Sequence, residues 1–100
     1  MVIILQKTKQ HIVIIGSSGM LGNAVTRYFS QDTEFVITGT VRSKESVALF
    51  PEQVRDNIVW GVDVDDFGTI TNIIKQQEPD IVINCVGLVK QLSEANDPLI

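Results

Sequence analysis

The sequence is poor in the residues that most often mark a reactive or secreted protein. It holds one cysteine, one histidine and one tyrosine in 100 residues, so no disulfide can form within the chain. Residues 1–5 are apolar but too short for a signal-peptide core, and with a single cysteine we expect a cytosolic protein. The net charge of −4 weighs against nucleic-acid binding, which usually needs a basic patch. No run approaches the ~18 apolar residues of a membrane span, so no membrane partner is expected.

The rest of the composition is that of an ordinary folded domain. Hydrophobic residues make up 44% of the chain and charged residues 20%. A chain of this length has room for one domain. We predict an N-terminal extension over residues 1–10 and a single domain over residues 11–100.

Apolar runs and helical patterns alternate along that domain. Continuous runs rich in β-branched residues predict strands buried on both faces of a parallel sheet, at residues 11–15, 35–41, 57–62 and 80–86. The order β-α-β-α-β-α-β predicts an α/β fold. We expect a Rossmann-type parallel sheet with helices on both faces, of which the first four strands are present in the order 3-2-1-4.

The helical patterns between the strands have identifiable faces and ends. The apolar faces are predicted to be Leu21, Ala24, Val25 and Tyr28 in the first long helix, and Phe67, Ile70, Ile73 and Ile74 in the second. Ser43 is the expected N-cap of a short helix that runs through Leu49. Asp65 or Asp66 would cap the helix that Pro79 ends. A last helix is expected to begin near Leu92.

A glycine-rich loop separates the first strand from the first helix. Gly16 would allow a sharp turn, Gly19 a close approach of the backbone to an anion, and Gly22 tight packing of the helix. The first N–H groups of that helix lack internal partners and its dipole favours an anion, so the loop is predicted to hold the diphosphate of a nicotinamide dinucleotide. The binding residues predicted here are Gly16, Ser18, Gly19, Met20, Leu21 and Gly22. A tight turn without a ligand is the alternative.

Arg42 follows the second predicted strand, where Rossmann domains meet the adenosine ribose. An acidic residue there holds the 2′-hydroxyl of NAD, whereas an arginine suits the 2′-phosphate of NADP. No acid occurs until Glu45, and Lys44 adds a positive charge. We therefore expect NADP as the cofactor, with NAD as the alternative. A solvated basic loop is the other interpretation of this segment.

Two further segments follow strands at the same edge of the predicted sheet. Asp63 could accept a hydrogen bond from the adenine amino group while Val64 packs near the ring, although turn capping explains Asp63 as well. Cys85, Val86 and Gly87 end the fourth strand, where open α/β sheets bind ligands. Plain sheet packing is the alternative for this second segment. Cys85 lies in an apolar strand and is interpreted as a small hydrophobic side chain, not a nucleophile.

Other chemistry-bearing residues are assigned structural roles. His11 begins the first strand, at the end opposite the cofactor, and Trp60 and Phe67 are assigned to packing. The sequence shows no metal-ligand cluster, so no metal site is expected. The only tyrosine, Tyr28, has no lysine four positions later, so no catalytic residue is assigned.

The chain resembles the extended short-chain dehydrogenase/reductase superfamily over residues 11–100. The resemblance is carried by Gly16–Gly22, Asp63–Val64 and Pro79–Gly87. Within the superfamily, residues 83–91 and Asn96–Leu99 look like sugar-nucleotide reductases of the dTDP-4-dehydrorhamnose reductase type. The resemblance implies NAD(P)-dependent reduction or epimerisation of a nucleotide-linked sugar.

In that family a Ser or Thr, a Tyr and a Lys perform the chemistry, the last two in a Tyr-x-x-x-Lys spacing beyond the fourth strand. The chain stops before that point, so the NAD(P)-binding domain is expected to be incomplete at its C-terminus. A non-catalytic NADP-binding regulatory subunit of a partner enzyme is the first alternative, and a degraded reading frame without a stable fold is the second. A missing fifth strand would expose residues 81–86 as an apolar edge, which predicts self-association there.

Overall fold

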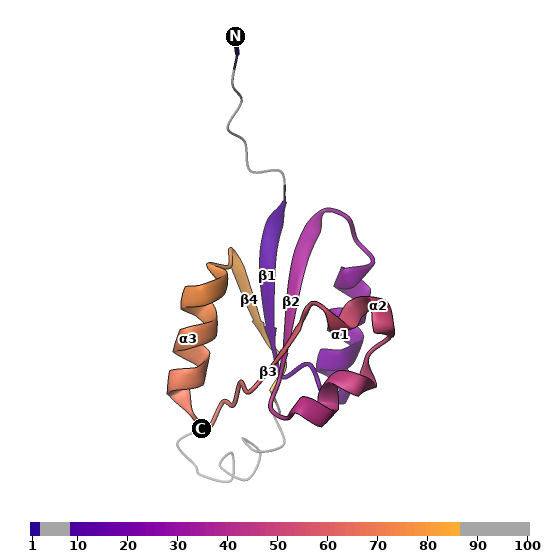
Figure 1. Ribbon diagram of the computed structural model, residues 1–100, viewed down its shortest axis with the longest axis vertical. Coiled ribbons are helices and arrows are strands. Elements are labelled where there is room, and N and C mark those ends of the chain that lie inside the picture. The colour runs from indigo at the N-terminus through magenta and orange to yellow at the C-terminus, as the bar shows by residue number, and fades with distance from the viewer. Residues whose placement is uncertain (3–8, 87–100) are drawn as a thin grey trace, which may run out of the picture.

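The computed structural model describes residues 1–2 and 9–86 (Figure 1). Most of the predicted N-terminal extension and the helix predicted near Leu92 lie outside these residues. The elements are β1 (Gln10–Ile15), α1 (Met20–Ser30), β2 (Phe35–Val41), the 3-10 helix η1 (Lys44–Leu49), α2 (Glu52–Arg55), β3 (Ile58–Trp60), α3 (Phe67–Gln77) and β4 (Ile81–Asn84).

The strands form one parallel sheet in the order β3-β2-β1-β4, which confirms the predicted Rossmann-type topology. Ile12 of β1 is in register with Ile37 of β2 on one side and Ile81 of β4 on the other. Helices cover both faces: α3 lies on one, and α1 and α2 lie on the other (Figure 1). Of the helices in the described residues, none has the length and apolar character that a membrane span requires.

The core lies around β1, whose residues Ile12–Ile15 are all buried. Successive side chains of a strand point to opposite faces, so this one run supplies two clusters. Val13 and Ile15 pack with Ile73 of α3, whereas Ile12 and Ile14 pack with Ile37 on the α1 side. The continuous apolar run therefore indicated a central strand correctly.

β4 does not have the predicted burial on both faces. Ile81 and Ile83 are partly buried on the α1 side, but Val82 is 44% exposed. Within the described residues β4 pairs only with β1, and an edge strand has fewer neighbours to cover it. The edge position of residues 81–84 thus agrees with the sequence analysis, and self-association through this strand stays a prediction.

The predicted inner face of α1 is correct only for Val25, which packs against the core cluster of Ile12, Ile14 and Ile37. Leu21 is 64% and Tyr28 69% exposed, and the buried residues of the helix are Gly22 and Thr26. Gly22 lies directly against the backbone of the glycine loop, and this contact determines which side of α1 faces the sheet. Further along that side Thr26 is buried, and Val25 and Phe29 pack against the core of the sheet.

The remaining helices agree with the predictions in part. Ile73 is the buried residue of α3, but Phe67 is 78% exposed and Ile74 is also exposed. Asp66, one of the two residues predicted to cap this helix, accepts a hydrogen bond from the Gly68 N–H at 3.1 Å.

The ends of the shorter elements also differ from the predictions. β3 covers only Ile58–Trp60, because Gly61 turns the chain with a φ of +90°. Ser43 precedes η1, but its hydroxyl bonds the Ser46 hydroxyl and not a backbone N–H. Pro51 is the N-cap of the unpredicted α2, since proline is compatible with a helix start.

Replacing Gly22 with alanine would place a Cβ 1.9 Å from the Gly16 carbonyl oxygen. That atom belongs to the backbone of the loop, so we expect Gly22→Ala to lose at least the ~1–3 kcal/mol typical of overpacking. Gly68→Ala is the matched control, because its Cβ would meet only Asp66 Oδ1, at 3.3 Å. Urea unfolding measures both variants. An unfolding midpoint of Gly22→Ala equal to that of the unmodified chain would contradict the packing.

Candidate functional site

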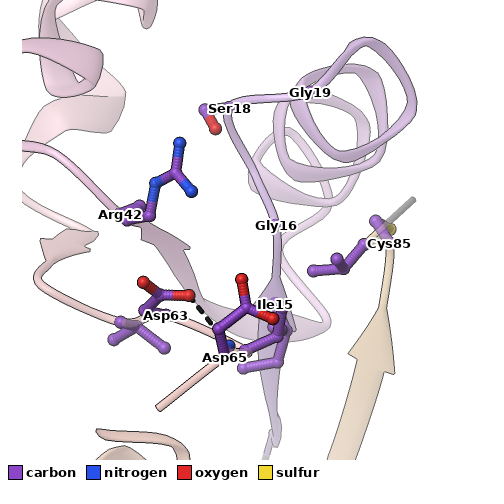
Figure 2. Close-up of a pocket in the computed structure, with 11 residues that line it drawn as sticks. Ile15, Gly16, Ser18, Gly19, Arg42, Asp63, Asp65 and Cys85 are labelled. Carbon is purple, nitrogen blue, oxygen red and sulfur yellow. Dashed lines mark hydrogen bonds between the residues drawn. The ribbon is translucent and has the colours of Figure 1, made fainter. Parts of the chain in front are cut away.

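A pocket of about 280 Å³ opens at the carboxyl ends of the strands (Figure 2). It is formed by the loop after β1, the residue after β2, the loop after β3 and the end of β4. Ligands of open α/β sheets bind at this edge, at the point where the strand order reverses, which is here between β1 and β4. The lining residues are Ile15, Gly16, Ser18, Gly19, Arg42, Val62, Asp63, Val64, Asp65, Cys85 and Val86.

Most of the residues predicted to bind a cofactor meet in this pocket. Those that line it are Gly16, Ser18, Gly19, Arg42, Asp63, Val64, Cys85 and Val86. Met20 and Leu21 are exposed at the start of α1 and do not line it, and Gly22 is buried beneath the loop. Gly87 lies outside the described residues. The binding role of each of these residues stays a prediction.

Backbone conformation and packing require a glycine at position 16 of the loop but not at position 19. Gly16 has a φ of +83°, and a Cβ there would lie 2.7 Å from Cγ2 of Val86. Gly19 has an ordinary φ of −73°, and a Cβ there would meet only the Gly16 carbonyl oxygen, at 3.8 Å. Neither backbone conformation nor packing within the described residues therefore requires a glycine at position 19. The space beside Gly19 is open to a ligand.

The start of α1 is suited to an anion. Within the described residues, Gly19 is an N-cap without a side-chain hydrogen bond, and the first turn holds no acidic residue. α3, by contrast, has the Asp66 carboxylate at its N-terminus. The first N–H groups of a helix carry a partial positive charge, so a negatively charged ligand is stabilised next to Gly19.

Ser17 is a residue of this loop that the sequence analysis missed. It is fully buried, and its Oγ accepts hydrogen bonds from Thr26 Oγ1 at 2.8 Å and from the Thr40 N–H at 3.1 Å. The same hydroxyl donates to the Ile14 carbonyl at 3.3 Å. The two groups that donate to this hydroxyl are 9 and 23 positions away, so no local spacing signalled their contact.

Arg42 lies one residue beyond the end of β2 and is exposed. Its carbonyl accepts a hydrogen bond from the Gly61 N–H at 3.2 Å, which fixes the backbone. The guanidinium extends along the pocket toward Ser18 (Figure 2), and no residue of the described chain pairs with it. Lys44 begins η1 and does not line the pocket.

Asp63 has the capping role that the sequence analysis kept as an alternative. Its Oδ1 accepts a hydrogen bond from the Asp65 N–H at 2.8 Å, drawn dashed in Figure 2. Its carbonyl accepts from Thr69 Oγ1 at 3.0 Å, which ties the loop to α3. A carboxylate has about four acceptor sites, so Asp63 retains capacity toward a ligand. Asp65, the other of the two residues predicted as the α3 cap, lines the pocket.

His11 has the structural role predicted for it. Its Nδ1 bonds the Gln77 carbonyl at 3.0 Å and its Nε2 the Thr38 hydroxyl at 2.8 Å, at the opposite end of β1 from the pocket. Trp60 is exposed, so its assignment to packing is wrong, as is that of Phe67. Trp60 is the last residue of the short strand β3.

Cys85 lies at the end of β4, and burial raises the pKa of its thiol. Only the thiolate is a strong nucleophile, so the raised pKa agrees with a hydrophobic role. The neighbouring Asn84 shapes the turn, because its Oδ1 accepts from the Val86 N–H at 2.9 Å.

Alkylation of the chain reports on Cys85 alone, since it is the only cysteine. We expect iodoacetamide to modify the native chain more slowly than the same chain unfolded in urea, at equal pH near neutrality. The native rate should continue to rise past pH 9.0, the ordinary pKa of a cysteine. A native rate equal to or above the unfolded rate would show an activated thiol.

Comparison with known proteins identifies the family of the chain. Residues 12–99 match the profile of one family, and this segment contains every residue that lines the pocket. A search of curated proteins found no match for the chain. With the parallel sheet, the glycine loop and a match over nearly its whole length, the chain belongs to the NAD dependent epimerase/dehydratase family.

Proposed function

We propose that this chain binds NADP(H) in the pocket and is the cofactor-binding part of an oxidoreductase that reduces or epimerises a nucleotide-linked sugar. The family is NAD-dependent, and the choice of NADP and of a sugar substrate goes beyond it. The observation that carries the proposal is the open space beside Gly19, at the uncapped start of α1, with the Arg42 guanidinium across the pocket.

The diphosphate is assigned to the loop and the first turn of α1. Gly19 leaves room for the phosphate oxygens to approach the backbone, and Ser18 is exposed beside it in the pocket. The N–H groups of Met20 and Leu21 belong to the first turn of the helix, so their backbone can bind the anion although their side chains point to solvent.

The adenosine is assigned to the loops after β2 and β3. Arg42 offers a planar guanidinium that suits bidentate contact with a 2′-phosphate. Asp63 and Val64 line the pocket next to it, where the carboxylate would accept from the adenine amino group and the valine would contact the ring. This part of the pocket therefore offers the Arg42 guanidinium to an anionic group of the ligand and the Asp63 carboxylate to a donor group.

When bound, the cofactor supplies the hydride for the reaction. The described residues bind and orient it, and Tyr28 does not line the pocket. The likeness to sugar-nucleotide reductases of the dTDP-4-dehydrorhamnose reductase type supports a 4-keto sugar as the substrate. The same likeness assigns proton transfer to a Tyr-x-x-x-Lys pair beyond the fourth strand.

Gly19→Val tests the diphosphate assignment. A Cβ at position 19 meets no described atom closer than 3.8 Å, and the branched side chain beyond it would fill the space assigned to the phosphates. We expect a folded variant whose NADPH binding is abolished in calorimetric titration. Ala24→Val, on the exposed side of α1, introduces the same valine side chain away from the pocket and should bind as the unmodified chain does. Undiminished binding by a folded Gly19→Val variant would refute the assignment.

Arg42→Ala tests the choice of cofactor. Loss of a charge-assisted contact costs roughly 1.5–3 kcal/mol, so NADPH affinity should fall about ten- to a hundredfold while NADH affinity changes little. Arg27→Ala is the control, because it removes the same charge from the exposed side of α1, away from the pocket. Equal weakening of both cofactors, or a preference of the unmodified chain for NADH, would count against NADP.

A further inference from the structure

Ser17 joins the two parts of the pocket that the proposed function assigns to different phosphates. Its N–H donates to the Thr40 carbonyl at 2.8 Å, and its Oγ accepts from the Thr40 N–H at 3.1 Å. The register of β1 with β2 ends at the pair Ile14–Gly39. Beyond that pair, where the backbone of β1 leaves the sheet, the Ser17 hydroxyl takes the place of a backbone carbonyl as the hydrogen-bond acceptor for β2.

The positions on either side of this double contact line the pocket. Ser17 stands between Gly16 and Ser18, and Thr40 stands two residues before Arg42. The side chain of Thr40 makes a further hydrogen bond to β1, because its Oγ1 donates to the Ile14 carbonyl at 2.9 Å. Both Ser17 and Thr40 are fully buried, so water does not compete for these bonds.

We propose that Ser17 is a positioning residue that sets the separation between the diphosphate loop and Arg42, and thereby the preference for a 2′-phosphate. The inference rests on the proposed function, since it needs a dinucleotide in the pocket. NADPH would contact both the loop and Arg42, whereas NADH lacks the phosphate that Arg42 meets. A change in the separation of the two parts therefore weakens NADPH more than NADH.

The contact with α1 provides a matched control. Thr26 donates to the same Ser17 Oγ, at 2.8 Å, but lies on the helix and not on the strand that leads to Arg42. Thr26→Val has nearly the same shape and removes that one bond. It leaves both bonds between Ser17 and Thr40 in place.

The test compares Ser17→Ala with Thr26→Val in the full chain, by titration with NADPH and NADH. Loss of the bond to the Thr40 N–H should lower the ratio of NADPH to NADH affinity about three- to tenfold in Ser17→Ala. Thr26→Val should keep the ratio of the unmodified chain. Equal loss of affinity for both cofactors in Ser17→Ala would reduce Ser17 to a purely structural role and overturn the inference.

A second measurement on the unmodified chain does not depend on the folding of any variant. If NADPH connects the loop to Arg42, it should slow hydrogen exchange of the Thr40 amide more than NADH does at equal saturation. Equal protection by the two cofactors would overturn the inference while leaving the proposed function intact. A chain that binds neither cofactor would instead refute the proposed function itself.

Discussion

The contact of α1 with the glycine loop is the constraint on which the rest of the structure depends. Gly22 lies so close to the Gly16 carbonyl that no Cβ fits between them. This approach brings the first turn of the helix to the edge of the sheet and turns Thr26 toward Ser17. The same approach places the start of α1, at Gly19, beside the pocket. One backbone contact thus determines both the packing of the helix and the position of its positive end.

The buried hydroxyls around Ser17 complete this arrangement. Where β1 leaves the sheet, Ser17 and Thr40 bond reciprocally, so the backbone groups at the end of β2 keep partners. Among the described residues, every buried side-chain nitrogen and oxygen has a hydrogen-bond partner. The Arg42 guanidinium, which has no partner among the described residues, is exposed in the pocket, where a ligand can reach it. This division between satisfied interior and open pocket is the physical basis of the proposed function.

The sequence predicted the sheet order and most of the pocket because both depend on local patterns. Strong apolar runs identify parallel strands, and their carboxyl ends must meet at one edge. The face of α1 was not predictable in this way. The apolar spacing of Leu21 and Tyr28 indicated one side, but the contact at Gly22, a residue without a side chain, selected another. Ser17 was missed for a related reason, since its role arises only when β2 is placed beside the loop.

A crystal structure of the chain with NADPH is the most direct test of the central claim, that the start of α1 and Arg42 bind the two ends of one cofactor. The account predicts the diphosphate against the backbone of Gly19–Leu21 and the 2′-phosphate in contact with the Arg42 guanidinium. A diphosphate bound elsewhere, or a 2′-phosphate directed to solvent with Arg42 turned away from it, would contradict the account.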